Sequence, residues 1–172
     1  MKSIFFFLIQ AFILSGAFAS VEIKWELKNL PEMTYLYREH GIAFGNEKEN
    51  TESNQKSLDT VKELIHEAKT RKLHFIKPAF FRFDLRAGKV LEVGLEIKEK
   101  RTAKAKFRAS GKYLEARYEG SLNFIGNVFH QLPEKLKSDG HILLRDEAYY
   151  QKETGGQKNS QLFTILFPLK EK

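Results

Sequence analysis

The chain has 172 residues, of which 30% are charged and 42% hydrophobic, and this length and balance predict one folded domain with a core of its own. It contains no cysteine, which excludes disulfide bonds, thiolate metal sites, iron–sulfur clusters and a cysteine nucleophile. The formal net charge of +7 produces a field that attracts anionic surfaces, but such a field does not specify a partner.

The start of the chain has the features of a signal peptide, residues 1–19. A lysine precedes an apolar run at residues 4–14, and Ala17 and Ala19 form a small-x-small cleavage sequence. The apolar run is shorter than the roughly 20 residues that a membrane-spanning helix needs. We therefore expect the mature protein, residues 20–172, to be periplasmic or secreted, without stable membrane insertion. An uncleaved N-terminal anchor is the alternative.

The first half of the mature chain predicts four strands and one helix. Residues 21–28 alternate apolar with charged side chains, which is typical of a half-buried strand. In residues 58–68 the apolar side chains recur at spacings of three, four and three, as on one face of a helix. The remaining strands are expected at residues 33–40, 75–85 and 90–98.

The second half repeats the order strand, helix, strand, strand. A strand at residues 112–119 ends at a glycine, as does the strand before the first helix. An apolar stripe over residues 122–136 predicts a helix, which Pro133 should kink or divide because proline removes a backbone hydrogen bond. The two closing strands are expected at residues 141–152 and 161–169.

The segment between the halves, residues 98–108 (KEKRTAKAKFR), is the most basic stretch of the chain. Nucleic-acid sites interleave such charge with stacking aromatic rings or place it on a groove-reading helix, so we interpret this segment as a solvated linker and expect no nucleic-acid partner. The half-repeats then cover about residues 20–98 and 105–172. This duplication predicts an α+β fold: a pseudo-twofold antiparallel sheet with helices on one face and a concave cleft on the other.

The segment at residues 141–150 (HILLRDEAYY) places an acid in a run that otherwise has the pattern of a buried strand. On a strand, Arg145, Glu147 and Tyr149 share one face, although a single bulge would exchange Glu147 for Asp146. A carboxylate beside aromatic rings is costly unless a cationic or hydrogen-bonding group meets it. A ligand is one such group, and an ion pair with Arg145 near the surface is the alternative.

The element order and four motifs resemble the GyrI-like, or bacterial effector-binding, small-molecule-binding domain family. The motifs are REHG at 38–41, GKYLEARYEG at 111–120, DEAYY at 146–150, which contains the family's Glu-x-Tyr, and FTILFPLK at 163–170. The chain departs from the family at its second turn, which reads Tyr118-Glu119-Gly120 in place of His-x-Gly. It also has no helix-turn-helix before the domain.

The resemblance implies that a small hydrophobic, aromatic or cationic molecule binds between the half-repeats. It places Glu147 at the floor of the pocket with Tyr149 beside it. By their face and position, Tyr37, Trp25 and Tyr118 are further candidates, and Trp25 also suits the core. Together with the export signal, the resemblance implies a stand-alone binding domain rather than a transcription regulator or an intracellular gyrase partner.

Two other functions remain open. Some members of the family resembled here hydrolyse reactive small molecules, and Glu147 would then act as a general base. The second is a non-catalytic interaction module of the cell envelope. The sequence contains no H-E-x-x-H motif, P-loop or dinucleotide motif, and no histidine is placed as a haem ligand, so we expect neither metal nor cofactor.

Overall fold

The computed structural model describes residues 22–43, 47–100, 102–120, 125–153 and 161–171. The predicted signal peptide lies outside these residues. Within them, no helix combines the length and the apolar character that a membrane crossing requires.

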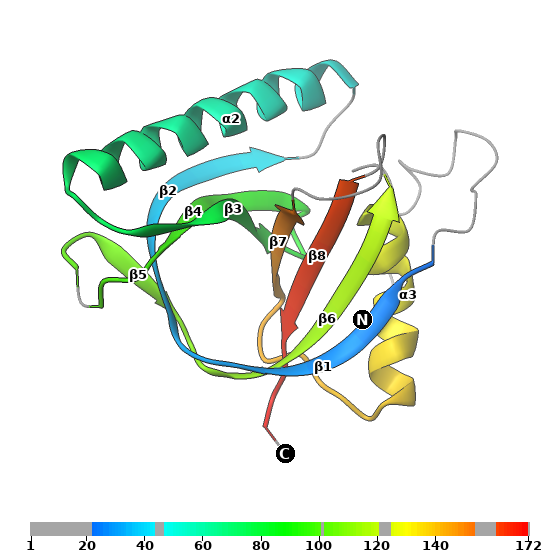
Figure 1. Cartoon of the computed structure of the whole chain (residues 1–172). Helices are drawn as coiled ribbons and strands as arrows, with labels where there is room; N and C mark the ends of the chain where they lie inside the picture. Colours follow the sequence, from blue (N-terminus) through cyan, green and yellow to red (C-terminus); the bar gives the residue numbers. More distant parts are fainter. Residues whose placement is uncertain (1–21, 44–46, 101, 121–124, 154–160, 172) are drawn as a thin grey trace.

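One sheet of eight antiparallel strands forms the body of the described fold (Figure 1). The strands of the first half are β1 (Lys24–Leu30), β2 (Met33–Ala43), β3 (Phe75–Asp84) and β4 (Lys89–Ile97). Those of the second half are β5 (Ala105–Arg108), β6 (Gly111–Gly120), β7 (Glu147–Glu153) and β8 (Gln161–Pro168). Their order across the sheet is β1-β6-β8-β7-β3-β4-β2-β5.

Each half contributes one long helix between its second and third strands. These are α2 (Glu47–Thr70) and α3 (Ile125–Ser138). The sheet curves strongly, and both helices lie on its outer, convex side (Figure 1). Helix α3 continues through Pro133, so of the two expected effects of this proline, a kink or a division, the division does not occur.

The sheet order shows the internal duplication directly. Exchanging each strand for its counterpart in the other half, β1 for β5 and so on to β4 for β8, reverses the order and otherwise leaves it unchanged. The pseudo-twofold axis therefore passes between β3 and β7. The first strand of each half pairs across to the other half, β1 with β6 and β5 with β2. The predicted α+β fold with a duplicated antiparallel sheet and helices on one face is confirmed.

Strand alternation divides the buried side chains between the two faces of the sheet. Helix α3 packs Ile125, Val128 and Leu132 against β6 and β8, and α2 packs Leu64 and Ala68 against β2 and β4. A third cluster lies on the opposite side, which we call the concave face. It consists of Met33, Tyr35, Phe80, Tyr113 and Tyr149. The fold thus buries aromatic rings on the face that neither α2 nor α3 covers.

Two segments differ from the sequence-based expectation. The basic segment is not a solvated linker throughout, because Ala105–Arg108 pairs with β2 as strand β5. Strand β7 begins at Glu147 rather than near residue 141. The residues before it are held to the end of β8 by an isolated bridge between Leu143 and Leu169, and Ile142 is 64% exposed. The apolar run at 142–144 therefore has the composition of a buried strand, but its side chains at 142 and 144 are exposed.

Candidate functional site

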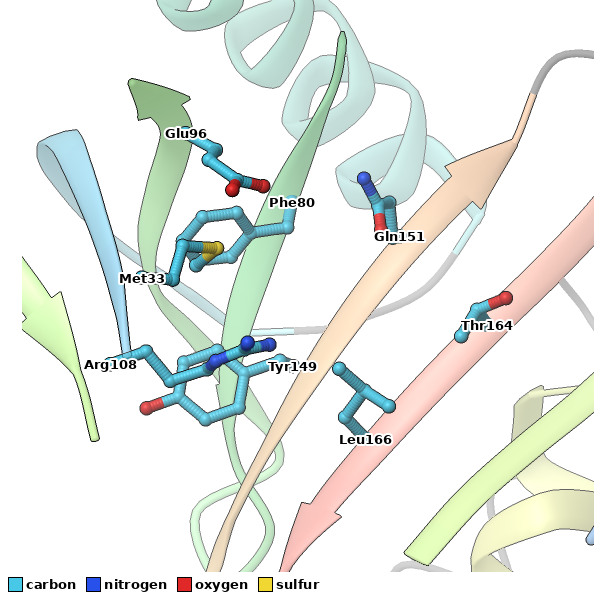
Figure 2. Close-up of a pocket in the computed structure, with 8 residues that line it drawn as sticks. All are labelled: Met33, Phe80, Glu96, Arg108, Tyr149, Gln151, Thr164 and Leu166. Carbon is cyan, nitrogen blue, oxygen red and sulfur yellow. The ribbon is translucent and has the colours of Figure 1, made fainter. Parts of the chain in front are cut away.

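The concave face carries a small cavity, of about 80 Å³, where the two halves meet (Figure 2). Six strands contribute to its lining. The residues are Met33 from β2, Phe80 from β3, Glu96 from β4, Arg108 from β5, Tyr149 and Gln151 from β7, and Thr164 and Leu166 from β8.

Aromatic rings form one wall of this cavity. The ring of Phe80 packs edge-on against Tyr35 at a centroid distance of 4.9 Å and lies 5.9 Å from the ring of Tyr149. Tyr149 in turn contacts Tyr113 at 6.5 Å. Burial raises the pKa of Tyr149 to about 12, so at neutral pH its hydroxyl keeps its proton and can donate a hydrogen bond.

Two charged side chains face the same cavity. Burial raises the pKa of the Glu96 carboxyl, and the nearby Arg108 guanidinium opposes this shift. Arg108 is only 8% exposed and packs over the ring of Tyr113, 5.2 Å from its centroid. No hydrogen bond or ion pair joins Glu96 to Arg108, although both belong to the described part of the chain. Figure 2 shows the two side chains on opposite sides of Phe80 and Met33.

A buried ion network lies beside the cavity on the same face. Glu92, which is 1% exposed, accepts hydrogen bonds from the Tyr35 hydroxyl and from Lys106 Nζ, each at 2.7 Å. Arg82 binds the same carboxylate through Nε at 3.0 Å and a terminal nitrogen at 3.1 Å. Burial opposes ionisation of Glu92, but these hydrogen bonds and the Arg82 charge together hold its pKa below the usual value.

Glu147, the acid emphasised by the sequence, belongs to this network. Its Oε1 atom accepts a hydrogen bond from Arg82 at 3.0 Å, and its buried Oε2 atom has no hydrogen-bond partner among the described residues. The expected alternative, an ion pair with Arg145, is wrong, because Arg82 on the neighbouring strand supplies the cation. Asp146 pairs instead with Arg86 at 2.6 Å. Glu147 does not line the cavity.

The other sequence candidates lie in two different places. Tyr149 lines the cavity, and Tyr37 lies nearby on β2, where Lys106 Nζ is 3.9 Å from its ring centroid. Trp25 and Tyr118 lie in the core on the helix side. Their rings contact Phe167 at 6.3 Å and Phe163 at 5.0 Å respectively.

Sequence reasoning missed the acids of β4, although a signal was present. In the stretch VLEVGLEI, Glu92 and Glu96 recur at even spacing on an otherwise apolar strand, with Gly94 between them. This is the pattern that drew attention to Glu147 and Tyr149, and applying it throughout the chain would have identified both acids. The role of Arg108 has no such signal, because it lies within a run of basic residues.

Solved structures share the fold of this chain, although no family model and no curated protein matches its sequence. Among solved structures, the C-terminal domain of EcmrR matches with a TM-score of 0.66 at 13% identity, over 87% of this chain and 99% of that one. SAV2435, solved bound to tetraphenylphosphonium, matches with a TM-score of 0.54 at 9% identity, over 86% and 94%.

A third match is a hydrolase from Listeria innocua, with a TM-score of 0.50 at 12% identity, over 86% of this chain and 92% of that one. At such low identities the likeness concerns the fold alone. EcmrR and SAV2435 have GyrI-like domains, so the chain has a GyrI-like fold.

Proposed function

Starting from the GyrI-like fold, we propose that the protein binds a small molecule in the concave-face cavity, and that the ligand is hydrophobic, aromatic or cationic. The observation that carries this proposal is the meeting, in one space, of aromatic rings and a carboxyl that has no hydrogen-bond or ion-pair partner among the described residues. Phe80 and Tyr149 supply the rings and Glu96 the carboxyl. SAV2435, which shares the fold, was solved bound to tetraphenylphosphonium, a hydrophobic cation.

The physical basis is compensation of a charge that burial destabilises. A cation that enters the cavity pairs with the Glu96 carboxylate, and each aromatic ring adds a cation–π attraction of about 0.5–2 kcal/mol. Glu147 contributes to the same field through its bond to Arg82 and its unpaired Oε2 atom. We therefore propose that Glu96 contacts the ligand directly and that Glu147 acts on it only through the electrostatic field.

Location and partners form part of the same proposal. The signal-peptide features of residues 1–19 support export, which would make the protein periplasmic or secreted. We also expect no nucleic-acid partner. Two cations of the basic segment before β6 are engaged inside the protein, because Lys106 binds Glu92 and Arg108 lines the cavity.

Thermal-shift measurements test the binding function. Ethylammonium and propylammonium, cations small enough for the cavity, should raise the melting temperature of the wild-type protein, because a ligand that binds only the folded state stabilises it. The shift should shrink in Glu96→Gln and persist in Glu63→Gln, which removes an exposed carboxylate on α2. Equal shifts in all three proteins would remove Glu96 from the site, and the absence of any shift would overturn the proposal.

Catalysis is a second candidate, favoured by the pKa of Glu96. A carboxyl whose pKa is raised by burial is closer to the range of an effective general base at neutral pH. Glu147, in contrast, is bound to Arg82. Incubation with a panel of esters and epoxides should then give turnover that Glu96→Gln abolishes and Glu147→Gln retains. Turnover that survives Glu96→Gln would exclude this mechanism.

A further inference from the structure

Arg108 is the least expected member of the cavity wall. Its side chain is more than nine-tenths buried, yet its Nε atom has no hydrogen-bond partner among the described residues. The remaining contacts of the guanidinium are weak: one terminal nitrogen lies 3.4 Å from the carbonyl oxygen of Pro31, and the group packs over Tyr113. A buried donor without a partner is costly, and since Arg108 lines the cavity, its guanidinium can donate to an anionic or acceptor group bound there.

The charges around the cavity are balanced. Among the described residues, the charged side chains that line the cavity or belong to the adjoining network are three carboxylates, Glu92, Glu96 and Glu147, and three cations, Arg82, Lys106 and Arg108. A ligand with only a positive charge would compensate Glu96 but leave the Arg108 guanidinium without an anionic partner in a partly desolvated site. A ligand with both charges would preserve the balance.

We propose that the ligand of the concave-face cavity is a small zwitterion, with an ammonium-type group bound by Glu96 and a carboxylate-type group bound by Arg108. This inference rests on the proposed binding function and specifies its ligand class. It explains why the two oppositely charged side chains share the cavity without forming an ion pair: the molecule between them pairs with both.

The volume of the cavity limits the size of this ligand. At about 80 Å³, the cavity is smaller than the roughly 150 Å³ space that accommodates benzene in an engineered protein core. A short aliphatic amino acid fits this range better than a large aromatic compound. Its methylene groups would lie against the Phe80 ring and Met33, between the two charged side chains (Figure 2).

Calorimetric titration with matched probes tests the proposal. The zwitterions are glycine, β-alanine and γ-aminobutyrate, which span a range of charge separations. Each is compared with two analogues in which a methyl group replaces either the ammonium or the carboxylate. We expect at least one zwitterion to bind about tenfold or more tightly than both of its analogues, because it forms one more hydrogen bond between charged groups than either analogue does; tenfold corresponds to about 1.4 kcal/mol.

Variants assign the two ends of the ligand. Arg108→Met should remove the preference for the zwitterion over the ammonium-only analogue, and Glu96→Gln the preference over the carboxylate-only analogue. Arg86→Met, which removes a cation that is 80% exposed, is the matched control and should bind as the wild type does. Circular dichroism checks that each variant folds, and Arg108→Lys, which retains the charge, provides a milder second change at that position.

The outcomes separate this inference from the proposed function. If propylammonium binds in a Glu96-dependent manner but no zwitterion exceeds its ammonium-only analogue, the zwitterion proposal is wrong and the binding function stands. The proposal is also overturned if Arg108→Met and Arg108→Lys both bind the zwitterions as tightly as the wild type. If no probe of any class binds, both are wrong.

Discussion

The ring of Phe80 lies directly against the backbone of Gly94. The two residues are cross-strand partners in β3 and β4, and a Cβ atom placed on Gly94 would come within 2.2 Å of Phe80 Cζ. Phe80 is 5% exposed and its ring also contacts Tyr35 and Tyr149, so a ring displaced from Gly94 would have to lose these contacts or enter the cavity. The missing side chain at position 94 therefore allows an aromatic ring to form the wall of the cavity.

Gly94→Ala should consequently destabilise the protein by about 1–3 kcal/mol, the usual cost of overpacking a closely packed region. Urea denaturation monitored by fluorescence measures the change. Adding Phe80→Leu to this variant should recover part of the loss, because the smaller side chain vacates the space. A Gly94→Ala protein as stable as the wild type would show that Phe80 moves freely.

Two buried tyrosines should respond differently to loss of the hydroxyl group. The hydroxyl of Tyr35 donates to Glu92 at 2.7 Å, whereas the buried hydroxyl of Tyr118 has no hydrogen-bond partner among the described residues. Tyr35→Phe should cost about 1.5–3 kcal/mol, the range for hydrogen bonds to charged groups, and Tyr118→Phe should be neutral or slightly stabilising. Equal losses in denaturation experiments would contradict the difference in their bonding.

The stability of the protein should depend on pH through Glu96. Since burial raises its folded-state pKa above the usual 4.5, the folded state binds more protons than the unfolded state between these two values. Stability is therefore lost as pH rises through this window. Glu96→Gln cannot titrate, so it should gain stability relative to the wild type as pH increases from 4.5 towards neutrality.

Glu92 provides a comparison of opposite sign. Its folded-state pKa is lowered, so its contribution to stability is present above the unfolded pKa of about 4.5 and is lost as pH falls through the folded value. The difference in free energy of unfolding between the wild type and Glu92→Gln should therefore grow, in favour of the wild type, as pH rises towards 4.5. Denaturation curves at several pH values measure both trends, and parallel curves for the two variants would refute these assignments.

The proposed export predicts a defined processed product. Expression in a bacterium should yield a mature protein that begins at Ser20, and intact-mass spectrometry measures this directly. Replacing both Ala17 and Ala19 by Asp should block cleavage, because the signal peptidase site requires small residues there. Glu22→Gln, beyond the site, should be processed normally. An unprocessed wild-type chain would contradict cleavage at this position.

The amino-acid sequence by itself determined the local elements and their duplicated order. Period-two alternation predicts strands and a 3.6-residue period predicts helices, and both signals depend only on neighbouring residues. The repetition of strand, helix, strand, strand was sufficient to predict a pseudo-twofold sheet, which the strand order confirms. The strand expected at residues 141–152 was too long at its start, because the apolar side chains before Glu147 are not buried in the sheet.

Only the tertiary structure decided which charges meet. Glu147 pairs with Arg82, 65 residues earlier in the chain, and Glu96 shares a cavity with Arg108 from an edge strand that had the composition of a linker. Such pairs are set by the order and register of strands across the sheet, which depend on contacts between distant segments. A buried carboxylate can be suspected from one strand alone, but its partner comes from another.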